Sequence, residues 1–331
     1  MNMNKFMFVL LASLVLGACS SDDNNQVQLQ PKPQSYPLTI EVTENSMIQD
    51  GEQSGNTTRA AITLGTTSAF ETFYMDYVYG SSYSSSSITA TRDSADKWTS
   101  INSWPVGGDT EVAWYASTYD NFQYNDGTPY INYEVEESAA DQHDLLVATK
   151  SGTYNSTGGK LFLTFDHACS ALRIFVKKST NINNKTLRIT RIVLKNVYKH
   201  GRYYYGTSSW NKDDIDTNTD YTLYSGTAIE LGSASYKVLN YADKANYSAL
   251  DDVASADKAY LFLIPQTLEA WNPSVALSNT YLELTCSIND GASQVAYIPF
   301  AATFEKGRKY DVKINIGKNS LYSGTGSKII N

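Results

Sequence analysis

Apolar and polar residues alternate along most of this chain, and a period of two is typical of β-strands with one buried face. The clearest runs cover residues 73–79, 161–167 and 310–316. Residues 172–176 alternate in the opposite parity to the run before them, which indicates the inserted residue of a β-bulge near 167–171. Further strands are predicted at residues 38–43, 112–117, 187–194, 259–264, 281–286 and 295–300.

Turn-forming residues separate these runs, and no long run shows the 3.6-residue period of an amphipathic helix. The turns fall at residues 107–108, 125–127, 158–159, 183–184 and 289–291. Short strands joined by polar turns predict an all-β protein built of antiparallel sandwiches. The Gly-, Ser- and Thr-rich stretch at 151–159 is the best boundary between two such domains, residues 36–157 and residues 158–331.

The composition supports this interpretation. The chain has 331 residues, and domains average about 150 residues. Only 18% of the residues are charged, whereas tyrosine alone contributes 25 residues, a mixture that suits pleated sheets and argues against an all-helical fold. The net charge of −8 argues against a nucleic-acid partner, because binding to phosphates requires a basic surface.

The first residues have the pattern of a cleaved leader. Lys5 is followed by an apolar stretch at 6–16, which is shorter than the roughly 20 apolar residues that span a bilayer. The sequence Leu16-Gly17-Ala18-Cys19 resembles the lipobox of bacterial lipoproteins, which predicts a signal peptide at 1–18 and lipidation of Cys19. An ordinary secretory signal that contains a cysteine is the alternative.

The residues after Cys19 predict a tether at the cell surface. Two or three acyl chains on Cys19 anchor a protein stably to a membrane. Residues 20–25 resemble the short acidic export signal that places lipoproteins of Bacteroides-type bacteria on the outer face of the outer membrane, and a plain hydrophilic tether is the other interpretation. Pro31 and Pro33 extend this lipidated tether as a linker to residue 35.

Three segments of the chain resemble one known family. Residues 144–148, a glycine-rich gap, 161–168 and 172–174 resemble the central signature of the fimbrillin-like proteins, which are pilus subunits and associated surface lipoproteins of Bacteroides-type bacteria. Residues 259–266 and 304–312 are similar to later parts of that family. The resemblance implies two transthyretin-like β-sandwich domains and a fimbrial subunit or a fimbria-associated tip or accessory adhesin, with no enzymatic activity and no cofactor.

The same resemblance implies a route of assembly. In the family, a trypsin-like protease cuts after an arginine and removes the first strand, and a strand from another fimbrillin-type subunit fills the groove. Arg59, followed by Ala60, lies where such a cut would remove residues 36–59 with their predicted strand. The alternative is an uncut, non-polymerising surface lipoprotein that recognises glycans or a host protein.

The end of the chain leaves the position in a fimbria open. Residues 317–331 alternate poorly, and the large apolar residues among them are Leu321, Tyr322, Ile329 and Ile330. This tail either donates a short strand or completes its own domain. Stalk, tip and stand-alone roles are therefore all compatible with the sequence.

The remaining cysteines and the histidines do not form a catalytic pattern. Cys169 and Cys286 lie in apolar, strand-like runs, and a disulfide and two buried free thiols both remain open. The three histidines lack the spacing of a metal site, and His167 has the parity of a core residue. We find no nucleophile elbow, P-loop or dinucleotide fingerprint.

Two further patterns are candidate binding sites. Asp214, Asp216, Asn218 and Asp220 place oxygen ligands at alternate positions, as calcium loops do, but the glycine and the glutamate of such loops are missing, which favours a solvated turn without a metal. The nearby aromatic residues are candidates for contact with a glycan or protein receptor, or ordinary strand residues. These are Tyr203, Tyr204, Tyr205 and Trp210.

Overall fold

The computed structural model describes residues 36–45, 47–49, 70–83, 87–95, 97–101, 103–125, 127–137, 141–211, 219–240, 248–250 and 260–330. The chain from Tyr36 onward forms one compact unit. Regular structure in the described residues is nearly all strand, apart from the one-turn helix α1 (Tyr154–Thr157) and the short 3₁₀ helix Thr180–Ile182. The all-β prediction is confirmed. Among the described residues, no helix has the length and apolarity to span a membrane.

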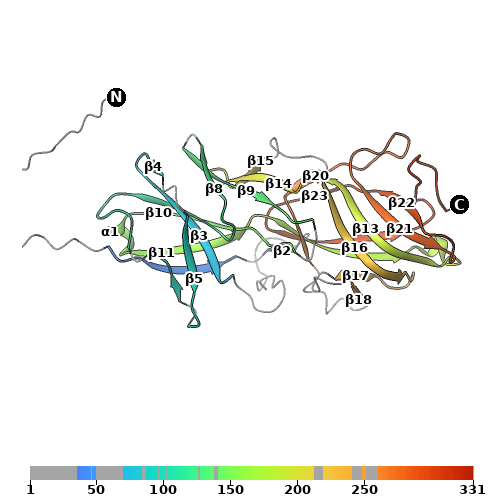
Figure 1. Cartoon of the computed structure of the whole chain (residues 1–331), viewed down its shortest axis with the longest axis horizontal. Helices are drawn as coiled ribbons and strands as arrows, with labels where there is room; N and C mark the ends of the chain where they lie inside the picture. Colours follow the sequence, from blue (N-terminus) through green and yellow to red (C-terminus); the bar gives the residue numbers. More distant parts are fainter. Residues whose placement is uncertain are drawn as a thin grey trace, which may run out of the picture. The chain divides into compact units, whose positions relative to one another are not determined.

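Seven strands in the first half of the chain close into a ring (Figure 1). Around the ring the order is β3, β5, β6, β1, β11, β10 and β7, and β7 pairs again with β3. Their bounds are β1 (Thr39–Glu44), β3 (Thr72–Tyr79), β5 (Ile88–Arg92), β6 (Trp98–Thr99), β7 (Val112–Ser117), β10 (Leu146–Gly152) and β11 (Lys160–His167). The short β4 (Ser82–Tyr83) extends β3 outside the ring.

The interior of the ring explains why these residues form it. Alternate residues of β11, Leu161, Leu163 and Phe165, are fully or almost fully buried, while their neighbours are exposed. Phe73 and Phe165 pack edge to face, with ring centroids 5.1 Å apart. A closed ring buries one face of every strand and leaves no unpaired edge on the strands within it.

Two facing sheets are built from the second half of the chain together with residues 48–49 of the first half. One has the order β18 (Ser248–Leu250), β17 (Lys237–Asn240), β12 (Ser170–Lys178), β24 (Arg308–Ile316) and β2 (Ile48–Gln49), and β19 (Leu261–Leu263) also pairs with β12. The other has the order β16 (Thr219–Glu230), β13 (Leu187–Val197), β21 (Tyr281–Ile288) and β22 (Gln294–Pro299). Leu172, Ile192 and Leu284, from both sheets, belong to one hydrophobic core.

Two smaller sheets supply further residues to that core. The first has the order β15 (Ser209–Asn211), β14 (His200–Tyr204), β9 (Thr128–Glu134) and β8 (Phe122–Asn125). The second pairs β20 (Gln266–Leu268) with β23 (Ala302–Phe304). The buried side chains of Ile131, Tyr203 and Phe304, from these two sheets, belong to the same hydrophobic core.

Two expectations about the sheets require correction. The sheets are not purely antiparallel, because β1 runs parallel to β11, and β12 and β2 both run parallel to β24. The pair of transthyretin-like sandwiches is not confirmed, since the first half closes into a ring instead of two open sheets. Alternation in sequence identifies a buried face but does not specify which strands pair or in which direction.

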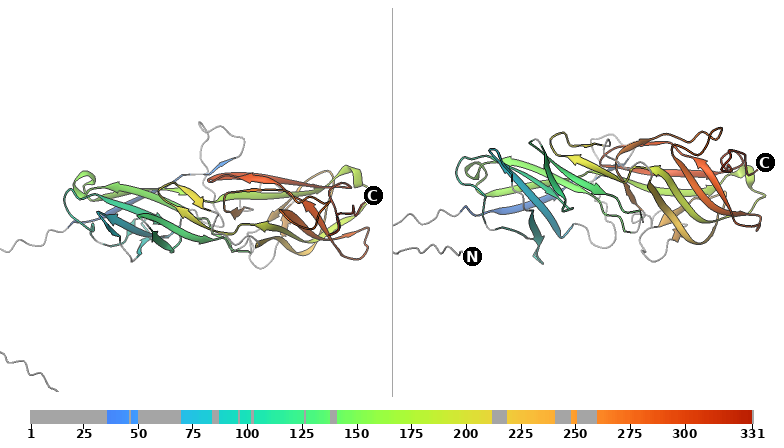
Figure 2. Two further views of the ribbon diagram at one scale, coloured as in Figure 1. Left: turned by 90° about the horizontal axis from the view of Figure 1, so that it is seen from above. Right: turned by 45° about the horizontal axis from the view of Figure 1, so that its top comes forward.

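The change from ring to sandwich occurs between β11 and β12. Only Ala168 and Cys169 separate these strands, and the yellow-green ribbon can be followed from one sheet to the other in Figure 2. The boundary predicted between residues 157 and 158 therefore cuts the ring, because β11 follows it. The change of parity marks this transfer between sheets and not a bulge. A register shift lies instead within β13, between Ile189 and Arg191.

Gly159 allows a close approach that its neighbour Gly158 does not need. Both residues follow α1 with positive φ, 75° and 62° respectively. A Cβ on Gly159 would collide with the carbonyl oxygen of Pro37, whereas the space around Gly158 is open. The Gly159 carbonyl also accepts the Thr39 N–H at 2.9 Å. Gly159 therefore places the start of β1.

We predict that Gly159→Ala lowers the thermal midpoint of unfolding clearly more than Gly158→Ala does. Either replacement forces alanine into a left-handed conformation at a cost of about 1–2 kcal/mol. Only Gly159→Ala also displaces the chain that enters β1. Thermal unfolding of both variants, followed by circular dichroism, compares the two costs, and equal midpoints would contradict the contact with Pro37.

Candidate functional site

The groove that holds β1 is the candidate functional site. β1 lies between β6 and β11 in the ring. It makes six register pairs with β11 and a single one, Ile40 with Trp98, with β6. Most of its ladder therefore depends on one neighbour, and removing it would leave β11 with an unpaired edge.

The inward face of β1 completes the core of the ring. Ile40 is buried, and Leu38 and Val42 pack partly buried against the same core. The intervening Thr39 and Glu41 are exposed. Full burial of a side chain such as isoleucine stabilises a fold by roughly 1.5–3 kcal/mol, so an empty groove would expose a costly apolar slot.

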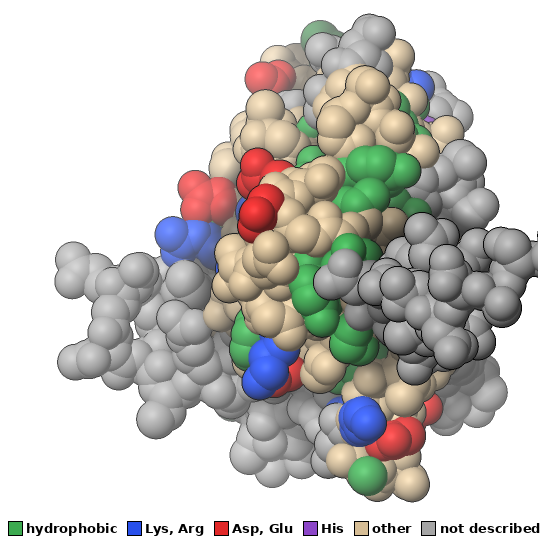
Figure 3. Space-filling view, turned by 90° about the vertical axis from the view of Figure 1, so that its left-hand side faces the viewer, with side chains coloured by type: hydrophobic (Ala, Val, Ile, Leu, Met, Phe, Trp, Pro, Cys, Tyr) green, Lys and Arg blue, Asp and Glu red, His purple; other side chains and the backbone are tan. Residues whose placement is uncertain are grey.

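An aromatic socket holds the residue that enters the groove. The Tyr36 ring packs edge to face on Tyr154 at 5.0 Å, and a side chain on Gly107 would occupy the position of the Tyr36 ring. The Tyr36 carbonyl accepts the Trp104 N–H at 2.6 Å. Figure 3 looks onto the side of the molecule where α1 lies, and hydrophobic side chains gather in the middle of that face.

A buried charged cluster holds the other end of the groove. His167, almost fully buried, binds Asp144 through Nδ1. Its Nε2 lies 3.4 Å from Oε1 of Glu44, the last residue of β1. The next residue is held as well, since Asn45 donates its side-chain amide to Asp166 at 2.7 Å and its N–H to the Phe165 carbonyl at 2.8 Å.

The cluster shifts two protonation equilibria. Burial alone would lower the pKa of His167, but Asp144, Glu44 and the Asn45 backbone raise the pKa above its ordinary value of 6.5. Burial raises the pKa of Glu44 above 4.5, with His167 opposing that rise and Asp144 adding to it. The cluster thus links β1, β11 and the segment before β10 through a charge on the imidazole.

Sequence reasoning identified His167 but not its partners. It placed His167 in the core on its parity, and the structure shows that the ring is buried within an ion-paired cluster. Glu44 shares the parity of Ile40 and Val42. A carboxylate at the end of an apolar row is therefore the sequence feature from which a buried partner of His167 could have been predicted. Asp144 opens the run 144–148 and carried no signal of its own.

Several predicted site residues lie outside the described part of the chain. These are the lipidation site Cys19, the processing site Arg59 and Ala60, and the first three residues of the acidic loop, Asp214, Asp216 and Asn218. The fourth, Asp220, lies in β16 and pairs with the Lys195 ammonium of β13. Within the described residues there is no group of three or more side chains able to hold a metal. The weak calcium-loop candidate therefore stays a prediction.

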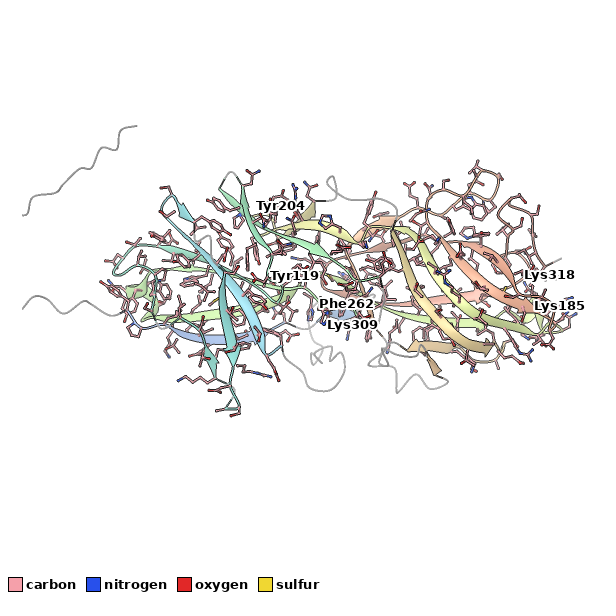
Figure 4. The ribbon with its side chains drawn as sticks, viewed as in Figure 1. Tyr119, Lys185, Tyr204, Phe262, Lys309 and Lys318 are labelled. Atoms are coloured by element: carbon pink, nitrogen blue, oxygen red, sulfur yellow. The ribbon has the colours of Figure 1, made fainter. Side chains whose placement is uncertain are left out.

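The structure divides the predicted aromatic cluster. Tyr203 and Tyr205 are 2% and 5% exposed, so they belong to the core and do not present a surface to a receptor. Trp210 is half-buried and donates its indole N–H to the Ala168 carbonyl at 2.7 Å. Tyr204, labelled in Figure 4, is partly exposed and packs against Tyr130. A recognition role is thereby restricted to Tyr204 and the exposed part of Trp210.

Both remaining cysteines are free and buried. Burial raises the pKa of Cys286 to about 11 and that of Cys169 well above its ordinary value. Of the two alternatives, the structure thus has two buried thiols, and their raised pKa values disfavour the reactive thiolate.

Comparison with known proteins gives one family. The profile described as fimbrillin-like matches residues 43–329. The chain is similar to a fimbrial protein from Bacteroides vulgatus at 16% identity and a TM-score of 0.50, over 84% of this chain and 95% of that one. It is also similar to a fimbrial assembly protein from Parabacteroides distasonis, at 9% identity and a TM-score of 0.43, over 87% and 94% of the two chains. No curated protein matches the chain.

We predict that the free energy of unfolding falls as the pH rises through the raised pKa of His167. The ion pairs of a histidine with a raised pKa contribute fully below about 6.5 and are lost above the folded-state value. The raised pKa of Glu44 acts in the same direction. Urea unfolding from about pH 6 to pH 8.5 measures the trend.

Glu44→Gln should flatten this pH dependence. Glu41→Gln is the matched control, because it removes the same charge from an exposed position of the same strand. Identical pH dependence in the wild type and the Glu44→Gln variant would show that Glu44 does not contribute to this coupling, which would then rest on Asp144.

Proposed function

The chain belongs to the fimbrillin-like family, and from that premise we propose that it is a structural subunit of a fimbria or a fimbria-associated tip or accessory adhesin. In this proposal it is exported as a lipoprotein, held on the outside of the outer membrane through Cys19, cut after Arg59 and assembled by strand complementation. It has no catalytic role. The observation that carries the proposal is the position of β1 as the one strand that closes the ring between β6 and β11.

The position of β1 supports complementation on physical grounds. A cut after Arg59 separates β1 and β2 from the chain that follows, while all six other ring strands and, apart from β2 and Met47, the sandwich sheets and their core lie beyond residue 69. Loss of β1 opens the β11 edge and the apolar slot around Ile40. An extended strand of another fimbrillin-type subunit restores both the ladder and the burial.

The C-terminal tail favours a tip or accessory position over a stalk position. Leu321 is completely buried, and Ile330 is 4% exposed. Tyr322 exchanges two backbone hydrogen bonds with Tyr297 of β22, at 2.9 and 3.0 Å. A tail packed in this way completes its own sandwich, and donating it would require these contacts to break. The packed tail equally favours the second candidate, a non-polymerising surface lipoprotein that binds glycans or a host protein.

We predict that the surface-exposed protein begins at Ala60 and that Arg59→Ala prevents this processing. The variant should keep its acylated start at Cys19 and should not enter polymers, because its groove stays filled. N-terminal sequencing and a ladder assay on denaturing gels measure both effects. Thr57→Ala, which changes the same segment without removing the arginine, should behave as the wild type.

The same experiment separates the two candidate functions. A surface protein found solely as acylated monomer starting at Cys19 would eliminate the fimbrial proposal and leave the binding lipoprotein.

We predict that Leu321→Ala lowers the free energy of unfolding by about 2–5 kcal/mol, the usual cost of truncating a buried leucine. Lys318→Ala, at an exposed position of the same tail, should change it by less than about 0.5 kcal/mol (Figure 4). Urea unfolding measures both variants. An unaffected Leu321→Ala protein would mean that the tail is a spare strand available for donation.

A further inference from the structure

The inward face of β1 is one row of side chains with a charged end. Tyr36, Leu38, Ile40, Val42 and Glu44 share one parity, and each is half-buried or buried. The outward residues of β1, Thr39, Glu41 and Thr43, are exposed. Glu44 is therefore an acid at an inward position, where a carboxylate carries a desolvation cost that it would not carry on the exposed outward face.

The groove carries a matching polar end. In the parallel ladder, Ile40 and Val42 lie opposite Leu161 and Leu163 of β11. The inward row of β11 then ends in His167, which Asp144 orients through the ring Nδ1. The other ring nitrogen, Nε2, lies 3.4 Å from Oε1 of Glu44, an ion-pair distance without the geometry of a hydrogen bond. The polar end thus belongs to the wall of the groove and remains there when β1 leaves.

The inward side chain that ends the strand, which pairs with Phe165 in register and lies beside His167, is restricted by charge. A carboxylate at this position forms an ion pair with the imidazolium, so that the ring lies between two carboxylates, Asp144 and the incoming acid. A lysine would place a second cation beside the ring, and an aliphatic residue would bury the polar Nε2 against hydrocarbon. Other ionisable groups near the cluster do not replace the acid, because Asp166 is bound by Asn45.

The tail of this chain does not fit that groove. Residues 317–331 contain no Asp or Glu. In the parity of Leu321 the next inward positions would be Ser323, Thr325 and Ser327, and in the parity of Tyr322 they would be Gly324, Gly326 and Lys328. Neither parity supplies consecutive apolar residues followed by an acid.

We propose that the β1 groove selects a strand that ends in an acidic residue. The strand that replaces β1 therefore comes from a different subunit and not from the tail of a second copy of this chain. That strand carries an aromatic residue at the position of Tyr36, apolar residues at the three following inward positions, and Asp or Glu at the position of Glu44, beside His167. The inference rests on the proposed function, since it assumes that β1 is exchanged.

Displacement of the cut segment from the full chain tests the inference. The chain is cut after Arg59 with an arginine-specific protease, and the segment that stays bound as β1 carries a fluorophore. Synthetic peptides of residues 35–45 then compete for the groove, and fluorescence anisotropy follows release of the segment. We compare the wild-type peptide, its Glu44→Gln and Glu41→Gln variants, and a peptide of residues 317–331.

The wild-type and Glu41→Gln peptides should displace the segment equally well. Glu44→Gln should weaken displacement by at least about tenfold, because it removes a charge-assisted contact from a buried site. The tail peptide should not displace the segment at the highest concentration tested. A second protein variant, His167→Gln, should make the Glu44→Gln and wild-type peptides equivalent, and the peptide comparison decides the matter alone if this variant does not fold.

Two failures are distinguishable. If the wild-type peptide does not displace the segment, β1 is not exchangeable. This result would refute both strand complementation and the selection of an acidic residue by the groove. If the wild-type peptide displaces the segment, but the Glu44→Gln peptide or the tail peptide does so equally well, strand complementation is retained. The selection of an acidic residue by the groove is then refuted.

Discussion

The parallel ladder between β1 and β11 is the interaction on which the first half of the molecule depends. Every other neighbouring pair in the ring is antiparallel, and β6, the other neighbour of β1, contributes one register pair. A closed sheet has no strand in reserve, so the loss of β1 converts a ring without edges into an open sheet. β1 also precedes the predicted cleavage site in sequence, so the proposed assembly step would act on the same element that completes the ring.

The groove is not isolated from the sandwich. β11 ends at His167, and β12 begins at Ser170. The link between them is held from the second half, since the Cys169 carbonyl accepts the Gly307 N–H at 2.9 Å and the Ser170 hydroxyl donates to the Glu305 carbonyl at 2.9 Å. The histidine at the end of the groove is therefore positioned by a segment anchored in both cores. Binding at the groove and the integrity of the sandwich share this anchor.

The amino-acid sequence predicts strands where one face is buried, and it fails where pairing decides the structure. Residues 112–117 and 73–79 become β7 and β3 with bounds correct to within one residue, because their alternation reflects a single apolar face. The parallel pair β1–β11 joins residues more than 100 positions apart, and the β3–β7 pair is not between neighbouring strands of the sequence, so local pattern contains no information on either. The residue type of Tyr203 and Tyr205 is compatible with both a recognition surface and an ordinary strand position, and it does not decide between them because burial depends on which sheet covers them.

Cleavage after Arg59 would turn the β1 segment from a part of the same chain into a separately bound ligand. While it is joined to β3 through the chain, β1 meets its groove at an effective concentration on the order of millimolar, and a competing strand has to overcome that advantage. A cut leaves every contact of β1 in place but removes the covalent link, so β1 becomes a ligand that is lost on dilution. Selectivity among competing strands then depends on the contacts themselves. In the proposed selection, the aliphatic row accepts many β-strands, whereas the Glu44–His167–Asp144 end accepts few, because a strand without an acid removes one of the two carboxylates that pair with the buried imidazolium. A buried ion pair that adds little net stability is thus well suited to deciding which strand occupies the groove.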